Sequence, residues 1–393
     1  MGINLIKRLK LVPRKKGKEY DREFVAYRRE WVAKQTHAKL SHIGRFLEKP
    51  GEMRRNIENL IGSVQIPIGI AGPLRVNGKF AKGMFYVPFA TTQGTLVECY
   101  HRGMIALTQA GGANVSVYKN EVSVSPVFMF KDILEGNKFI MWVNKNFKRI
   151  KEEAEKTTKH GRLLRITPYS TGRTVILNFS YFTKDAMGLN MISIATNRAC
   201  LYISKKIKPQ RYYLRSNLSS DKKASFFNLI TGYGKEVSVE AVLPKDVVGV
   251  YLHTSPEEMY SFWYASIFGS FQSGMIGTNA HHANGLAAIF LACGQDVAQI
   301  VNASIGISML EITKEGDLYV CSKLPSLIVG TVGGGTGLPT QRECLEIMGC
   351  FGEGKVEKFA EIVAAALLAG EVSIAGALAS GEFAMADITL RAR

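Results

Sequence analysis

The spacing of apolar and polar residues changes sharply near residue 185, and the change predicts a strand followed by a helix. Residues 174–182 are mostly β-branched or aromatic, and the run is too short for a free-standing helix, so it predicts a strand. From Met191 onward apolar side chains recur at helical spacing, which predicts a helix over 187–206. The segment Thr183–Met191 is therefore expected to carry the chain from the strand into the helix.

The same patterns extend through a region of alternating strands and helices. They predict, in chain order, strand 127–130, helix 136–157, strand 163–168, strand 174–182, helix 187–206 and strand 212–214. This βαββαβ order is the ferredoxin-like arrangement. Because segments of different pattern precede and follow it, we expect a small domain inserted in a larger one. The expected fold class is α+β, with an N-terminal helical region over 1–60, a small domain over 127–213, and a large domain formed by 61–126 and 214–393.

The rest of the large domain predicts helices and one strand pair. The expected elements are a helix from about residue 94 to residue 111, buried helices over 260–274 and 283–301, a strand pair over 311–326, and Ala-rich helices over 356–369 and 371–380. The most apolar stretch, 362–379, is interrupted by Glu371 and is rich in Ala and Gly. It therefore predicts a packed helix rather than a membrane span.

Composition indicates a globular protein of two or three domains with a basic surface. The chain has 393 residues, 46% of them hydrophobic, and a net charge of +17. The basic residues near the N-terminus lack interleaved aromatic residues, so we expect a solvated basic face and no nucleic-acid partner. The six cysteines show neither CxxC pairs nor a metal-ligand spacing. This pattern predicts reduced thiols in a cytoplasmic protein with no metal site and no membrane attachment.

The turn between the strand and the helix has features of a phosphate-binding site. Asp185 could cap the following helix, and Gly188 would let the backbone pass close to another group. A helix start presents free N–H groups and the positive end of the helix dipole, which suits a phosphate. An ordinary strand-to-helix turn explains the same residues, so both interpretations stay open at this point.

The segment Asp185-Ala-Met-Gly-Leu-Asn-Met191 resembles the NADPH-binding motif of 3-hydroxy-3-methylglutaryl-CoA (HMG-CoA) reductases. Four further segments resemble that family in the same order, namely 58–74, 216–223, 294–299 and 330–341. The resemblance covers about residues 50 to 385 and is closest to archaeal-type class I members. It implies the family's large domain with an inserted nucleotide-binding domain, NADPH as cofactor, and a CoA thioester as substrate. It also implies a homodimer or higher homo-oligomer, because the family assembles its active site across a subunit interface.

The family reduces a thioester with a lysine, an aspartate, a glutamate acid and a histidine near the C-terminus. The resemblance places Lys222 at the lysine, as the donor to the oxyanion, and Asp296 at the aspartate that keeps it charged and oriented. Gln93 stands in place of the glutamate, and a glutamine cannot supply a proton. Asp387 stands near the histidine position, and an ordinary aspartate is ionised at pH 7. Two proton donors of the family are therefore replaced.

The resemblance also implies binding residues. Those expected to hold NADPH are Thr158, Lys159, Asp185, Met187, Gly188, Asn190 and Gln295, with Lys159 in place of the usual arginine. Those expected to hold the CoA thioester are Arg102, Asp221, Lys223, Arg215, Val124, His281 and Asn284. Val124 replaces an arginine that contacts the acyl group, Arg215 replaces a serine, and His281 is a candidate substitute acid. These changes predict an acyl group other than hydroxymethylglutaryl.

Three functions are compatible with these residues. The expected one is an NADPH-dependent reductase acting on a different acyl thioester, or on an aldehyde or ketone. The second is a catalytically silent protein that binds CoA or NADP(H), which the coupled loss of the two acids favours. The third is HMG-CoA reduction itself with unusual acids, against which the residues at 124, 215 and 387 argue.

Overall fold

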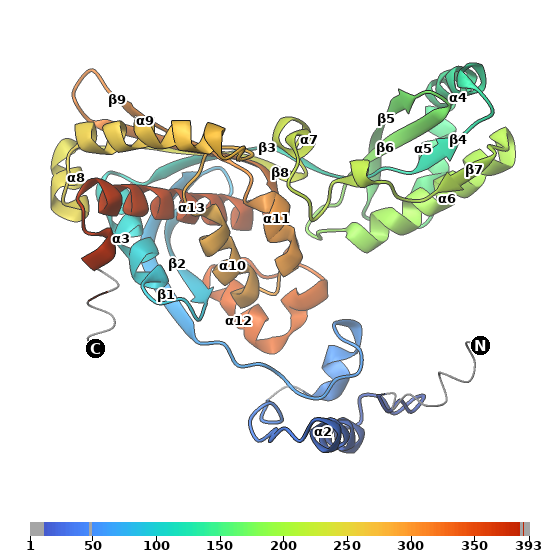
Figure 1. Cartoon of the computed structure of the whole chain (residues 1–393), viewed down its shortest axis with the longest axis horizontal. Coiled ribbons are helices and arrows are strands. Elements are labelled where there is room, and N and C mark those ends of the chain that lie inside the picture. Colours follow the sequence, from blue (N-terminus) through green and yellow to red (C-terminus); the bar gives the residue numbers. More distant parts are fainter. Residues whose placement is uncertain (1–11, 47–48, 386–387, 389–393) are drawn as a thin grey trace.

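A computed structural model describes residues 12–46, 49–385 and 388 of the chain. The molecule has a larger body built on a sheet, a smaller body at the right of Figure 1, and an N-terminal segment below them. Each body has its own buried apolar cluster, one lined by β1, β2, α3 and α13 and the other by β6 and α6. The fold class is α+β, as the sequence predicts.

Six strands form the sheet of the larger body. Their order is β2-β1-β3-β8-β10-β9, and the neighbours are antiparallel except for the parallel pair β1–β3. The predicted strand pair over 311–326 is present as β9 and β10. The strands are β1 (Ile68–Gly78), β2 (Lys82–Ala90), β3 (Ala113–Val124), β8 (Gly234–Leu243), β9 (Ile307–Ile312) and β10 (Leu318–Leu327).

Helix α13 (Val356–Ala379) is the central helix of the larger body and lies against its sheet (Figure 1). Two separate helices were expected here, but the structure has one helix of 24 residues. Gly370, at the expected break, does not end the helix. It makes room for an aromatic ring instead, since a Cβ at this position would lie 2.5 Å from Cζ of Tyr100. The other helices of this body are α3 (Leu96–Gln109), α7 (Phe226–Thr231), α8 (Lys245–Leu252), α9 (Pro256–Gln272), α10 (His282–Ala292), α11 (Ile300–Ala303) and α12 (Pro339–Ile347).

Helix α13 is long and apolar enough to cross a membrane, yet 78% of its most apolar window is buried inside the molecule. Two of its carboxylates serve the interior. Glu361 accepts the backbone N–H groups of the turn at residues 79–81, and Glu371 accepts those of Ala280 and His281. Buried charges are tolerated when several hydrogen bonds satisfy them. The helix therefore packs as the core of the larger body.

The smaller body follows the predicted strand and helix order, with one difference of detail. The expected helix over 136–157 is split at Asn146 into α4 and α5, and the Asn146 amide donates to the Trp142 carbonyl. In the larger body, the helix expected over 283–301 ends at Ala292, because Gly294 adopts a positive φ of 63°. The elements of the smaller body are β4 (Val127–Met129), α4 (Ile133–Lys145), α5 (Phe147–Glu155), β5 (Arg162–Thr171), β6 (Thr174–Phe182), α6 (Leu189–Ile207) and β7 (Arg211–Tyr213).

The two bodies share strand β3. Its first part pairs with β8 in the larger body, and its last residues, 122–124, pair with β6 of the smaller body. The chain returns at Ser216, whose backbone N–H and hydroxyl both donate to the carbonyl of Ser125, each at 2.8 Å. The outgoing and returning segments are therefore hydrogen-bonded to each other.

The N-terminal segment contains α2 (Arg22–Thr36) and a 3₁₀ helix, η1 (Pro50–Arg55). A solvated basic face was expected here, and most of the described basic residues are exposed, but Arg28 is fully buried. Its guanidinium donates to the carbonyls of Pro13, Glu19 and Leu60. The five N–H donors of arginine suit this role, so at this position the basic residue holds the segment together.

Lys235 of β8 is a second buried cation, and its burial lowers the stability of the folded chain. Its side chain has no exposed surface, and Nζ donates to the Val329 carbonyl at 2.8 Å. Desolvation lowers the pKa of Lys235 from its ordinary 10.5 to about 8, although Glu357 and Asp185 act in the opposite direction. The unfolded chain therefore binds this proton more tightly than the folded one.

We expect Lys235→Met to raise the free energy of unfolding at pH 7 by ~1–2 kcal/mol. The lowered pKa corresponds to about 3 kcal/mol of lost stability at neutral pH, from which about 1–2 kcal/mol for the hydrogen bond is subtracted. The lysine protein should gain stability as the pH rises from about 8 toward 10.5. Urea unfolding of both proteins at pH 7 and pH 10 measures the effect, with Lys314→Met, in the exposed β9–β10 turn, as control. A destabilised variant at pH 7 would contradict this expectation.

Candidate functional site

Lys222 and Asp296 form an ion pair at the surface of the larger body. Nζ of Lys222 lies 2.8 Å from Oδ2 of Asp296, and the two side chains are 42% and 35% exposed. Lys222 comes from the loop between β7 and α7, and Asp296 precedes the 3₁₀ helix η3 (Val297–Gln299). The pair therefore holds the Lys222 side chain in place where solvent can reach it.

The loop that carries Lys222 is held by two buried asparagines. Lys222 has a positive φ of 57°, and its backbone N–H donates to Oδ1 of Asn302 at 3.0 Å. Asn228, fully buried on α7, accepts the Ser220 hydroxyl and donates to the carbonyls of Ser220 and Lys223. Sequence reasoning missed both asparagines. Their only signal is a polar residue in apolar surroundings, which does not identify a partner.

Three residues expected at the substrate lie on the same loop. Nη2 of Arg215 is 2.9 Å from Oδ1 of Asp221, and the ammonium of Lys223 donates to the Asp221 carbonyl at 3.2 Å. The Arg215 side chain is 40% exposed. Asp221 thus gathers two cations beside Lys222, an arrangement that suits an anionic group.

Val124 was expected beside the same substrate, and the structure places it elsewhere. Its side chain is fully buried in the apolar cluster of the smaller body, opposite Phe179 in the neighbouring strand. Alternate residues of a strand face the same side, so Val124 shares the core face with Val122. In this conformation the Val124 side chain has no exposed surface, and its expected contact with the substrate stays a prediction.

Within the described residues, Gln93 makes no hydrogen bond to the ion pair. Gln93 lies in the exposed turn between β2 and α3, where its backbone N–H donates to the Thr91 hydroxyl at 3.0 Å. Among the described residues its side chain forms no hydrogen bond. Asp387 lies outside the residues that the structure describes.

His281 immediately precedes helix α10 and is 7% exposed. Its Nδ1 is 3.3 Å from the Asn284 amide, and its Nε2 is 3.9 Å from Sγ of Cys99. Desolvation lowers the pKa of His281, although Glu371 opposes this. The imidazole is therefore neutral at pH 7, which argues against the expected use of His281 as a substitute acid.

Arg102, expected at the phosphates of CoA, is bound within the chain. Its Nε donates to the Ser373 hydroxyl at 2.9 Å and its Nη2 to the Ser373 carbonyl at 2.6 Å. Its Nη1 also lies 3.7 Å from Glu382. The guanidinium therefore anchors α3 to α13, and a ligand would share it with these partners.

The expected capping role of Asp185 is wrong. Its Oδ1 accepts the backbone N–H groups of Lys355 at 2.9 Å and Val356 at 3.2 Å, so it caps α13 of the larger body and not α6. Helix α6 has no side-chain cap, and Gly188 precedes it with a φ of 78°. The glycine is required, because a Cβ would lie 2.5 Å from Cγ2 of Thr183. Among the described residues no side chain caps the first N–H groups of α6, which leaves them available for a phosphate.

The turn at 158–161 packs against the start of α6. The Thr158 hydroxyl accepts the N–H groups of His160 and Gly161 and lies 2.9 Å from Sδ of Met191. Lys159, at the tip of this turn, is exposed and makes no ion pair within the described residues. The turn thus brings an unpaired cation next to the free helix start. Met187 and Asn190, also expected at the nucleotide, lie on either side of that start and are half-buried and exposed.

Gln295 joins the ion pair to the nucleotide motif. Its amide accepts the Gly330 N–H at 2.8 Å and donates to the Gly330 carbonyl at 3.0 Å. The next residue, Thr331, donates its N–H to the Asp185 carbonyl at 2.8 Å. Asp296, adjacent to Gln295, is thereby held at a fixed position relative to the 185–188 turn. Gln295 was expected to touch the cofactor, but its buried amide connects the parts of the site.

Comparison with known proteins gives a consistent result. The sequence matches the family model described as hydroxymethylglutaryl-coenzyme A reductase over residues 24–392. It is 44% identical over 367 residues to the 3-hydroxy-3-methylglutaryl-coenzyme A reductase of Methanocaldococcus jannaschii, covering 91% of this chain and 90% of the relative. It is 44% identical over 371 residues to the same-named protein of Methanothermobacter thermautotrophicus, covering 94% and 93%.

The fold is similar to a solved structure from Streptococcus pneumoniae, the class II 3-hydroxy-3-methylglutaryl-CoA reductase bound to NADPH in open conformations. The TM-score is 0.68 with 17% sequence identity, over 90% of this chain and 96% of that one. At this identity the likeness concerns the fold.

Proposed function

This chain belongs to the hydroxymethylglutaryl-coenzyme A reductase family, and from that premise we propose that it is an NADPH-dependent reductase of HMG-CoA. The single observation that carries the proposal is the Lys222–Asp296 ion pair, connected through Gln295 to the 185–188 turn. The sequence led us to expect a different acyl thioester. The relatives favour HMG-CoA itself as the substrate, because proteins named HMG-CoA reductase match more than nine-tenths of this chain.

Reduction of the thioester to an alcohol needs two hydrides, which two NADPH molecules, bound one after the other, would supply. The first addition places negative charge on the carbonyl oxygen, and the C–S bond then breaks to release the CoA thiolate and an aldehyde. The second addition leaves an alkoxide. The Lys222 ammonium, held by Asp296, would stabilise each oxyanion by a charge-assisted hydrogen bond and supply the proton that the alkoxide takes.

The substituted acids fit a slow reaction. A thiolate is a tolerable leaving group at neutral pH, because a thiol has a pKa near ~8.5, so water can protonate it afterwards. Loss of a general acid typically costs about 10²–10⁴-fold in rate. Gln93 can still hold the thioester oxygen or the sulfur by a hydrogen bond from its amide, although it supplies no proton.

The residues fit a bound dinucleotide. The free N–H groups at the start of α6 and the exposed Lys159 would hold its phosphates, and the glycine at 188 allows close approach of the backbone. Asp185 would act by fixing the turn to α13. In this proposal residues 127–213 are an inserted nucleotide-binding domain, and the protein works as a homodimer.

The two cations beside Lys222 on the same loop would hold the acyl end of the substrate. Arg215 and Lys223 both contact Asp221, and a carboxylate could bind between the two cations. Arg102, His281 and Asn284 would contribute on the CoA side. A different acyl thioester stays the second candidate, because Val124 is buried and Arg215 is already paired.

Consumption of NADPH, measured with HMG-CoA and with a panel of acyl-CoAs and aldehydes, tests the proposal. We expect slow turnover of HMG-CoA and none of the unbranched thioesters. Turnover of another thioester alone would assign the second candidate. If no substrate is turned over but NADPH and CoA still raise the melting temperature, the protein is a binding module and the proposal fails.

A further inference from the structure

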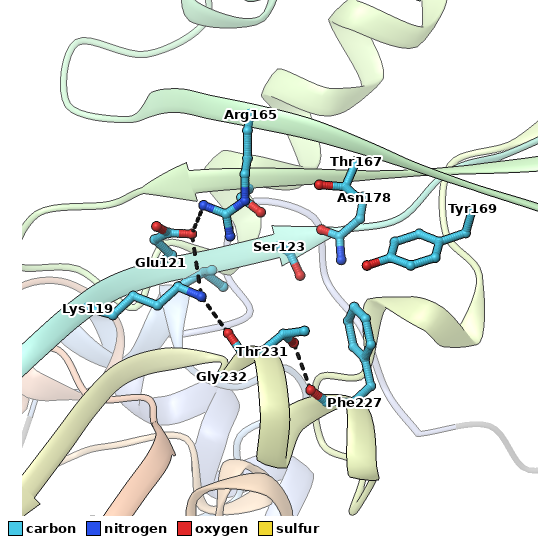
Figure 2. Close-up of a pocket in the computed structure, with 12 residues that line it drawn as sticks. Lys119, Glu121, Ser123, Arg165, Thr167, Tyr169, Asn178, Phe227, Thr231 and Gly232 are labelled. Atoms are coloured by element: carbon cyan, nitrogen blue, oxygen red, sulfur yellow. Dashed lines mark hydrogen bonds and ion pairs between the residues drawn. The ribbon is translucent and has the colours of Figure 1, made fainter. Parts of the chain in front are cut away.

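A polar cavity of about 100 Å³ lies between the smaller body and helix α7. Figure 2 shows side chains from β3, β5 and β6 on one side and from α7 on the other. None of the residues assigned above to catalysis, NADPH or CoA lines it. The cavity is therefore separate from the candidate active site, and its volume suits a compact ligand of several non-hydrogen atoms.

The cavity contains hydrogen-bonding groups without partners. Asn178 is 6% exposed, and its Oδ1 is buried with no hydrogen bond. Its amide points toward Tyr169 and Ser123 in Figure 2. Ser123 and Ser180 also line the cavity and are 8% and 5% exposed. A buried polar group left unpaired costs about 1–3 kcal/mol, so Asn178 indicates a polar ligand, and the two serines offer it further hydrogen bonds.

Charge at one end of the cavity selects an anion. Glu121 lies between two cations, with Arg165 paired to it and the Lys119 ammonium 3.8 Å away. Lys119 also donates to the Thr231 carbonyl of α7. Two cations and one carboxylate leave a single net positive charge, and Arg165 keeps N–H donors that Glu121 does not use. This matches a monoanionic carboxylate better than a phosphate, which carries between about −1.5 and −2 near neutral pH.

Helix α7 connects the cavity to the loop of Lys222. Phe227 and Thr231 of α7 face the cavity, whereas Asn228, one residue along, holds the loop by three hydrogen bonds. Neighbouring residues of a helix point to different sides, so one short helix serves both. A ligand that ties α7 to β5 and β6 would also restrict the loop.

We propose that this cavity binds a small hydroxycarboxylate and that the bound ligand rigidifies the loop carrying Lys222. The carboxylate pairs with Arg165 and Lys119, and the hydroxyl groups bond Asn178, Ser123 and Ser180. The product of the reaction proposed above, a branched dihydroxy acid, belongs to this chemical class. Control of the enzyme by its own product rests on that proposed function, but binding of a hydroxycarboxylate in the cavity does not.

Isothermal titration calorimetry of the full chain with glycerate, with the branched dihydroxy acid and with inorganic phosphate tests the binding. We expect a hydroxycarboxylate to bind more tightly than phosphate, and Arg165→Gln and Asn178→Ala each to weaken it at least about tenfold. Arg162→Gln, on the same strand and outside the cavity, is the matched control and should bind as the parent does. Equal affinity in Arg165→Gln, or no binding of any probe, would overturn the site. Circular dichroism confirms that each variant is folded.

Hydrogen exchange tests the coupling without need of activity. Amides at 220–223 should exchange more slowly in the liganded parent protein, and ligand should have no effect on them in Arg165→Gln. Binding with unchanged exchange there would keep the site and overturn its link to the loop. An inactive reductase that still binds the ligand would leave this inference standing and count only against the proposed function.

Discussion

Lys222→Met is expected to lower kcat/KM for HMG-CoA by about 10³-fold and to leave the affinity for NADPH unchanged. The methionine keeps the length of the side chain but removes the charge that we propose faces the developing oxyanion, and loss of one such donor typically costs about 10²–10³-fold in kcat. The side chain is 42% exposed, so the fold should tolerate the change. Single-turnover kinetics and NADPH titration measure the two effects separately.

The control for this prediction is Lys314→Met, which removes an exposed lysine from the β9–β10 turn. It should match the parent protein in rate and in melting temperature. Asp296→Asn should also lower kcat, because Lys222 loses the carboxylate that orients it. If Lys222→Met keeps the parent's kcat, the ion pair has no catalytic role.

Gln93→Glu is expected to raise kcat for HMG-CoA at pH 5 by about 10²-fold, and the double variant with Asp387→His to raise it further. A positioned general acid typically contributes about 10²–10⁴-fold. Gln93 is exposed and its side chain has no hydrogen bond among the described residues, so the isosteric change breaks no contact. An ordinary Glu carboxyl has a pKa near ~4.3, so the gain should be largest at low pH and fall as the new carboxyl ionises.

A pH–rate profile from pH 5 to 9 checks this prediction, because only the variant should show the additional descending limb. Gln272→Glu, at the exposed end of α9, is the control and should leave the profile unchanged. If the variants gain nothing on HMG-CoA but gain on another thioester, the acyl pocket around Arg215 has changed its substrate.

The sequence predicted most elements because their patterns are local. The strand over 174–182 and the helix that follows it depend on residues that are neighbours in the chain, and both are found within two residues of the expected bounds. The predicted bounds of an element were wrong where a contact with a distant part of the chain determines where that element ends. From the sequence alone Gly370 predicts the end of a helix. In the structure it lies within a helix and makes room for the ring of Tyr100 from another helix.

The site shows the same division. The Lys222–Asp296 pair could be named in advance only through the family resemblance, since the two residues are far apart in the sequence. The true partner of Asp185, the start of α13, is about 170 residues away. Neither Asn228 nor Asn302 belongs to a recognisable motif, and only their burial beside the loop shows what they hold.

Strand β3 determines how the two bodies can move. One continuous strand pairs in both sheets, and the returning chain is hydrogen-bonded to Ser125, the residue that follows this strand. The connection between the two bodies is therefore not a flexible hinge. Relative motion must instead be a twist of the strand, small in amplitude and shared with the neighbours of β3 in both sheets. A dinucleotide carried by the smaller body would approach the lysine by torsion, and stiffening or loosening that one strand should change how often the two meet.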